Sequence, residues 1–403
     1  MKFAIQHNIF RSALTKGSLA TLTKDAQNSE SYRKQPTIRC IKLTADAEGL
    51  TLESSASGLS ARTFVSKSDV KVEITGSLCV DTSEMIEDLD KLKFAHTLEF
   101  EYDPNQVKSD ASLPSRILVK AINAKGRNAF EWSYDVYSCR SFPKVEFCGK
   151  DPQFSVNQAN LKRGMDAVGF TKKEDEDHIL DNVLIGIVNN VIQLGTTDRQ
   201  RGSIIRIVNG IKLNAKDALY LVNWDLLSDA LKCYDADDMI DFVFEDGNTY
   251  LTIRDDKNIT SFRFSLPDYK LTEKFGRLFE LMKTKTKFTV TIDDKNEFLQ
   301  ATMIMNLRST TANYHFKEGA DEIQIDYSSR HKAAQVGCRK IEGGMKTPML
   351  LSVRLFLDIL QKMEGNEIQI SVANDEERVF VQDASDPNYF YLMIRKRNSA
   401  PKV

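Results

Sequence analysis

One pattern of predicted helices and strands occurs three times along the chain, and this repeat constrains the fold more than any other feature. Each copy begins with an amphipathic segment whose apolar residues recur every three to four positions, which is typical of a helix with one buried face. A second such segment follows roughly seventy residues later. The pairs of predicted helices are residues 6–16 and 80–93, residues 157–170 and 222–235, and residues 293–305 and 351–364.

Short predicted strands surround these helices. A strand-like stretch (KFAI, QFSV or KFTVTI) precedes the first helix of each copy, and paired alternating strands follow the second helix. The turns Asp246-Gly247 and Asn374-Asp375 suit hairpins, and Asp81, Asn223 and Ser352 suit N-caps of the second helices. Chance alternation is the other explanation, but three copies in one order argue against it. The sequence therefore predicts an α+β fold with two helices packed on antiparallel sheets in each domain.

Length and composition agree with several domains. A chain of 403 residues is too long for one core, and its 41% hydrophobic and 28% charged content is that of an ordinary globular protein. Its apolar runs are far shorter than the ~20 residues needed to span a membrane. We therefore expect three domains and no membrane segment. The expected domains are residues 1–149, 150–283 and 284–403.

The motifs of common enzymes and metal sites are missing from the sequence. It has no glycine-rich phosphate loop, no G-x-S-x-G and no H-E-x-x-H, and its six cysteines and five histidines are scattered. This favours reduced thiols in the cytoplasm and no cofactor or metal. The acidic run 172–178 leaves a metal-dependent nuclease open as an alternative, although a solvated loop is favoured because calcium-loop spacing is absent.

Basic residues lie off the apolar stripes of the predicted helices. They could form ordinary solvated faces, because helices usually present mixed charge to water. If the helices instead line one concave surface, these cations would neutralise phosphates without reading bases. The residues on these helices are Arg11, Lys16, Lys91, Lys93, Lys162, Arg163, Lys232, Lys295, Arg354 and Lys362.

One short stretch carries a specific resemblance. Residues 196–202 read TTDRQRG after a predicted strand, and they are similar to the A-T-D-G-H-R-L of the bacterial sliding clamp, the beta subunit of DNA polymerase III. Residues 178–184, 267–269 and 391–394 also match motifs of this family. The chain therefore resembles a divergent sliding clamp over essentially its whole length.

The resemblance implies a non-catalytic processivity factor. Two copies would close head to tail into a six-domain ring around duplex DNA and tether the replicative polymerase in the cytoplasm, at the nucleoid. The implied DNA-facing residues are Arg11, Lys16, Arg33, Lys34, Gln35, Lys162, Arg163, Lys172 and Lys173. The implied dimer interface comprises Leu89, Leu92, Phe130 and Trp132 of the first domain and Ile304 and Met305 of the third. A clamp-fold interaction scaffold that is not loaded on DNA is the alternative.

The resemblance also implies a pocket for the peptide tails of the polymerase and the clamp loader. Its residues would be Leu180, Thr197, Arg199, Gln200, Arg201, Gly202, Pro267, Leu392 and Ile394. The apolar members would hold hydrophobic anchors, and Thr197 and Arg201 would bind polar groups of the peptide. Arg199 replaces the glycine of the family motif and Gly202 replaces its leucine, so we expect an altered pocket. The segment 16–36 is longer than is usual in the family, and a basic tail, 395–403, extends past its usual end.

Overall fold

The computed structural model describes most of the chain and divides it into two compact units. The described residues are 1–22, 36–56, 58–102, 115–143, 147–172, 180–215, 218–245, 250–263, 276–328 and 331–396. The first unit comprises Met1–Ala159, Lys212–Asn214 and Asp225–Leu266, and the second comprises Asn160–Ile211, Ala215–Trp224 and Pro267–Val403. The three domain boundaries expected from the sequence stay a prediction.

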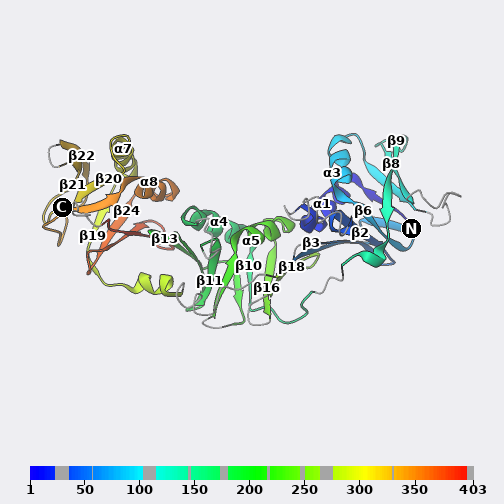
Figure 1. Cartoon of the computed structure of the whole chain (residues 1–403), viewed down its shortest axis with the longest axis horizontal. Coiled ribbons are helices and arrows are strands. Elements are labelled where there is room, and N and C mark those ends of the chain that lie inside the picture. Colours follow the sequence, from blue (N-terminus) through cyan, green and yellow to red (C-terminus); the bar gives the residue numbers. More distant parts are fainter. Residues whose placement is uncertain are drawn as a thin grey trace. The chain divides into compact units, whose positions relative to one another are not determined.

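The first unit is built on one antiparallel sheet. Its described strands follow the order β14-β10-β16-β17-β18-β4-β3-β2-β6-β9-β8-β7-β1-β5. Figure 1 labels β10, β16, β18, β3, β2, β6, β8 and β9 of this sheet. Those strands are β1 (Lys2–Gln6), β2 (Cys40–Ala45), β3 (Gly49–Ala56), β4 (Leu59–Ser66), β5 (Val70–Ile74), β6 (Gly76–Asp81), β7 (Thr97–Glu101), β8 (Arg116–Ile122), β9 (Asn128–Tyr137), β10 (Phe154–Asn157), β14 (Ile211–Leu213), β16 (Met239–Glu245), β17 (Tyr250–Arg254) and β18 (Asn258–Arg263).

The helices of the first unit pack on this sheet through apolar faces. Phe10 of α1 packs in a tilted arrangement against Phe3 and Phe100 of the strands beneath it, at ring-centroid distances of 6.4 and 4.7 Å. The helical elements are α1 (His7–Gly17), η1 (Leu19–Leu22), η2 (Pro36–Arg39), α3 (Thr82–Lys91), η3 (Cys139–Ser141), α5 (Trp224–Ala230, which begins in the second unit) and η5 (Leu231–Cys233).

The second unit contains two antiparallel sheets. Their described strands follow the orders β15-β11-β12-β13-β26-β25-β24-β19 and β22-β21-β20-β23. Those strands are β11 (Asn182–Val188), β12 (Val191–Thr197), β13 (Arg201–Ile207), β15 (Ala218–Asn223), β19 (Thr286–Ile292), β20 (Thr311–His315), β21 (Glu322–Ser328), β22 (His331–Gly337), β23 (Met349–Ser352), β24 (Ile368–Ala373), β25 (Arg378–Asp383) and β26 (Tyr389–Ile394).

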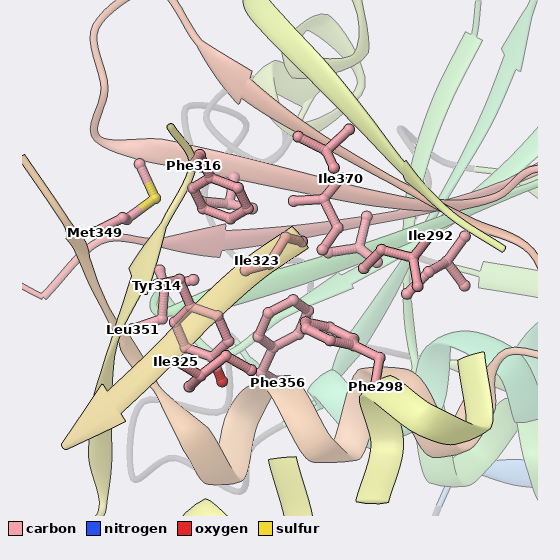
Figure 2. Close-up of a cluster of buried hydrophobic side chains, with 14 of the residues drawn as sticks. Ile292, Phe298, Tyr314, Phe316, Ile323, Ile325, Met349, Leu351, Phe356 and Ile370 are labelled. Atoms are coloured by element: carbon pink, nitrogen blue, oxygen red, sulfur yellow. The ribbon is translucent and has the colours of Figure 1, made fainter. Parts of the chain in front are cut away.

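A large core fixes α7 and α8 to these sheets. Phe298 of α7 packs edge-on against Phe356 of α8 at 5.2 Å, and Phe356 lies 5.3 Å from Tyr314 of β20. Figure 2 shows these three rings meeting among buried aliphatic side chains of both sheets. The helical elements are α4 (Gln158–Val168, which begins in the first unit), η4 (Gly169–Thr171), η7 (Leu281–Lys283), α7 (Lys295–Asn306) and α8 (Val353–Lys362).

The structure confirms the α+β fold and the six predicted helices, although the fourth, predicted at 222–235, is split into α5 and η5. Asp81 caps α3 as predicted, because its carboxylate accepts a hydrogen bond from the Ser83 amide (3.0 Å). Ser352 occupies the N-cap position of α8 as predicted, but its side chain makes no cap hydrogen bond, and it is also the buried last residue of β23. Residues 246–247 lie outside the described residues. In the β24–β25 turn the positive φ (55°) falls on Glu376.

Candidate functional site

Arg201, the first residue of β13, is the best-anchored side chain of the predicted pocket. Its Nε donates a hydrogen bond to Asp198 Oδ2 (2.8 Å), and its Nη1 donates to Asp358 Oδ2 of α8 (2.5 Å). Its Nη2 donates to the Phe170 carbonyl (3.0 Å), and its guanidinium lies 5.2 Å from the centre of the Phe170 ring. The side chain is only 12% exposed. In the free chain Arg201 therefore holds η4 and α8 to β13 instead of pointing to solvent.

The turn before Arg201 is closed by its own side chains. Asp198 Oδ1 accepts hydrogen bonds from the amides of Gln200 (2.9 Å) and Arg201 (2.8 Å). Thr197 Oγ1 donates to the Arg201 carbonyl (2.7 Å) and accepts from the Arg199 amide (3.1 Å). In the free chain these groups of Thr197 and Arg201 therefore have internal partners, and their binding to polar groups of a peptide stays a prediction.

Arg199 adopts a left-handed backbone conformation, with a φ of 70°. This conformation is strained for a residue with a Cβ and suits glycine. The turn therefore has the shape that the glycine of the similar motif would favour. Arg199 and Gln200 are both exposed, at the rim of the site.

The apolar part of the predicted pocket is already covered. Leu180 and Leu392 are 3% and 6% exposed, and they belong to one apolar cluster with Leu278 and Phe279. A Cβ added to Gly202 would lie 2.8 Å from Leu278 Cδ1. Of the predicted apolar wall, Ile394 is open to solvent, at 46% exposed, and Pro267 lies outside the described residues.

Buried hydroxyl groups support the site from within. Thr171, Thr196 and Ser203 are fully buried, and their hydroxyl groups form hydrogen bonds with one another. The carbonyl of Val168, at the end of α4, is a further acceptor within hydrogen-bond distance of all three oxygens. Each hydroxyl has one proton, which it donates either to this carbonyl or to a neighbouring hydroxyl. This cluster anchors η4 to β12 and β13 and so positions the Phe170 carbonyl beneath Arg201.

Sequence reasoning missed Asp358, Phe170, Leu278 and Phe279 as parts of this site. Asp358 carried a signal, because it is a lone acid in the otherwise apolar stretch LFLDIL of its helix. The pair Leu278-Phe279 carried none, because it lies outside every predicted helix and strand, and an isolated apolar pair has no fixed structural partner in the sequence.

Two residues expected to face DNA have acidic partners. Arg11 Nε donates to Asp90 Oδ1 (2.6 Å), and Lys16 Nζ donates to Asp235 Oδ2 (2.7 Å). Both lie beside a cavity of about 780 Å³ in the first unit, whose lining includes the further basic residues Lys93 and Lys232. The acids therefore offset part of this positive charge.

The other residues expected to face DNA differ in their surroundings. Lys162 and Arg163 of α4 are exposed. The Lys172 ammonium lies 6.0 Å from the centre of the Trp224 ring. Residues 33–35 and 173 lie outside the described residues.

The six residues expected at the dimer interface fall into two groups. Phe130 and Ile304 are 53% and 52% exposed, and Trp132, half-buried, packs 5.5 Å from the Phe130 ring. Leu89, Leu92 and Met305 are 1%, 8% and 0% exposed, so their side chains are not available to a partner. The helical period explains this correction, because Leu89 and Met305 lie on the core-facing sides of α3 and α7. Two exposed residues missed by sequence reasoning, Met303 and Leu307, adjoin Ile304.

The described residues contain no group of three or more side chains that could hold a metal ion. Residues 173–179, most of the acidic run considered for a metal, lie outside them. The six cysteines are free, and Cys79 Sγ lies 3.5 Å from Cys139 Sγ. None of the helices in the described ranges is long and apolar enough to cross a membrane.

Comparison with known proteins relates the chain to sliding clamps by fold. No family model and no curated protein matches the sequence. The DNA polymerase sliding clamp of Bacillus subtilis is 18% identical, with a TM-score of 0.74 over 99% of both chains. That of Caulobacter crescentus is 15% identical, with a TM-score of 0.72 over 98% of this chain and 100% of its own.

A third structure is the DNA polymerase III subunit beta of Pseudomonas aeruginosa bound to griselimycin. It is 14% identical, with a TM-score of 0.72 over 98% of this chain and 99% of its own. The chain therefore has the sliding-clamp fold from end to end, on a sequence that has diverged far from these structures.

Proposed function

We propose that the chain is a non-catalytic DNA sliding clamp, a processivity factor that encircles duplex DNA and tethers a replicative polymerase in the cytoplasm. The observation that carries the proposal is the similarity to clamp structures over 99% of both chains. A ring with this function holds the polymerase near the primer end and so raises its effective concentration without breaking or forming a bond. Loose contacts to phosphates suit sliding, because base-specific contacts would stop it.

The ring would close head to tail between two copies. Phe130 and Trp132 of one copy supply an apolar edge, and Met303, Ile304 and Leu307 of the other supply an exposed apolar patch. An interface between two different patches of the same chain closes into a ring when its rotation is two-fold. Exposed apolar patches of this kind mark association sites more often than isolated surface residues do.

Retention on circular DNA tests the ring directly. The clamp, loaded on nicked circular DNA by the host's clamp loader, should stay bound through gel filtration and should leave when the circle is cut. Ile304→Asp should convert the dimer to a monomer by light scattering and abolish retention, while Lys317→Asp, an exposed change outside the patch, should preserve both. A wild-type monomer at micromolar concentration, or retention that persists after linearisation, would contradict the proposal.

We further propose that polymerase and clamp-loader tails bind around Ile394, Arg199 and Gln200, the exposed members of the predicted pocket. Griselimycin is bound in the structure of a P. aeruginosa sliding clamp, so it offers a second ligand with which to test binding to this chain. In the double variant Gln200→Ala/Ile394→Ala, which leaves the buried Arg201 in place, we expect weaker binding of a fluorescent polymerase-tail peptide and an intact dimer. Equal peptide affinity in wild type and variant would refute the pocket.

One observation favours the alternative of an interaction scaffold that is not loaded on DNA. Arg11 and Lys16 are paired with Asp90 and Asp235, which lowers the positive charge available to phosphates. A dimer that binds tail peptides and never remains on circular DNA, even with its clamp loader, would identify this function.

A further inference from the structure

A row of three glycines crosses one face of the eight-stranded sheet in the second unit. Gly186 lies in β11, Gly195 in β12 and Gly202 in β13, and these strands are neighbours. Gln193 pairs with Gly186 and Thr197 pairs with Gly202, each two positions from Gly195. Side chains two apart on a strand share a face. The three positions, which we call the glycine row, therefore leave a strip of this face without side chains.

The chain itself fills this strip. Residues 276–283, which we call the connector segment, are helical at 276–280 and continue into η7. A Cβ at Gly186 would lie 2.4 Å from Phe279 Cε2, and a Cβ at Gly195 would lie 3.0 Å from both Leu278 Cδ2 and Phe279 Cε1. With the 2.8 Å approach of Leu278 to Gly202, the Leu-Phe pair touches all three glycines. Leu278 and Phe279 are 6% and 4% exposed.

The same pair covers the apolar wall of the proposed peptide pocket. Leu180 and Leu392 belong to the cluster that contains Leu278 and Phe279, and the partly buried Leu281 of the connector segment packs against it. Gly202 stands where the family motif has leucine, so Leu278 occupies space that a side chain of β13 would otherwise take. The pocket is therefore occupied from within the chain.

The contacts that hold the connector segment are apolar. Among the described residues, the polar side-chain contacts of this segment are internal, between Lys283 Nζ and the Glu280 carboxylate at 2.9 and 3.0 Å. A cavity of about 330 Å³ lies beside the segment and is lined by Phe279, Glu280 and Lys283. Displacing the segment therefore breaks no hydrogen bond to the described part of the sheet, and there is space next to it.

We propose that Leu278 and Phe279 act as an intramolecular ligand of the partner pocket, so that a partner peptide binds by displacing the connector segment. This inference rests on the proposed function of the pocket. The occupant that the glycine row accepts is an aliphatic residue followed by an aromatic one, which defines the class of competing peptide. The apparent Kd for the partner is the intrinsic Kd divided by the fraction of chains whose pocket is open, so an occupancy of about 99% by the connector segment weakens binding about a hundredfold.

The first experiment compares binding to the full-length dimer before and after the anchors are removed. The probes are a fluorescent polymerase-tail peptide and a fluorescent peptide of residues 276–283, GRLFELMK. Leu278→Ala/Phe279→Ala should bind both peptides at least about tenfold more tightly than wild type does. The matched variant Glu280→Ala/Lys283→Ala keeps both anchors and should behave like wild type. A GRLFELMK peptide with alanine at both anchor positions should bind neither chain.

The second experiment needs no substitution, so it tests the proposal even if the double variant fails to fold. Hydrogen–deuterium exchange of residues 276–283 in wild type should accelerate when the tail peptide saturates the dimer. Unchanged exchange with the peptide bound, or equal tail-peptide affinity in wild type and a folded double variant, overturns the intramolecular ligand. If the tail peptide binds no form of the chain while GRLFELMK binds the double variant, the pocket's proposed partner fails and the occupancy stands. If GRLFELMK does not bind the folded double variant, the occupancy fails.

Discussion

Arg201 Nη1 donates a hydrogen bond to Asp358 Oδ2 at 2.5 Å, across 157 positions of sequence. This ion pair joins the start of β13 to α8, and Arg201 also bonds Asp198 and the Phe170 carbonyl. Arg201, which matches the arginine of the sliding-clamp motif, therefore holds the turn at Asp198, η4 and α8 together in the candidate site.

Removing Asp358 should destabilise the second unit. Asp358→Asn keeps the shape and loses the charge, so we expect a loss of about 1 kcal/mol in the free energy of unfolding, at the low end for bonds to charged groups because Asp358 is 35% exposed. Urea denaturation measures it, with Lys362→Gln as a control at the end of the same helix. Equal stability of Asp358→Asn and wild type would show that this pair adds nothing.

Arg199→Gly should stabilise the turn. The φ of 70° costs a residue with a Cβ about 1 kcal/mol that glycine does not incur, although glycine's greater freedom in the unfolded chain offsets part of the gain. We expect a small rise in the melting temperature. Gln200→Gly, at the next position, should lower it. A fall for Arg199→Gly would mean that the arginine side chain has stabilising contacts larger than the backbone strain.

Neutralising the acids beside α1 should strengthen DNA binding. Asp90→Asn/Asp235→Asn frees Arg11 and Lys16, and two freed phosphate contacts would steepen the dependence of log affinity on log salt by roughly two. Fluorescence anisotropy with duplex DNA over a salt series measures the slope. The control variant carries Arg11→Met and Lys16→Met in addition to the two changes, and its slope of log affinity against log salt should return to the wild-type value. An unchanged slope would place these cations away from DNA.

The thiol of Cys139 should titrate differently from the buried thiols. The hydrogen bond from the Cys79 thiol lowers the pKa of Cys139 to about 7, whereas burial raises the pKa of Cys40 to about 12. A thiolate forms above its pKa, so alkylation of Cys139 by iodoacetamide should rise between about pH 6 and 8 while Cys40 stays unreactive. Mass spectrometry of the labelled peptides follows both sites.

Cys79→Ala removes the donor and should move the Cys139 alkylation profile toward higher pH. The same profile in Cys79→Ala and wild type would rule out the hydrogen bond as the cause of the lowered pKa.

The sequence determined the elements of this fold because their signals are local. Helix periodicity marked α1, α3, α4, α5, α7 and α8, and the carboxylate of Asp81 needed only a nearby amide to cap α3. It also located the Thr-Thr-Asp turn, since Asp198 closes it with amides two and three residues away.

Only the tertiary structure decided what that turn does. Packing between segments far apart in the sequence pairs Arg201 with Asp358 and buries Leu392 in one cluster with Leu278. It also decided that Leu89 and Met305 face their own cores while Phe130 and Ile304 face solvent. Periodicity gives each helix an apolar stripe, but the partner that covers a side chain is set by how sheets and helices meet, and no local pattern contains that information.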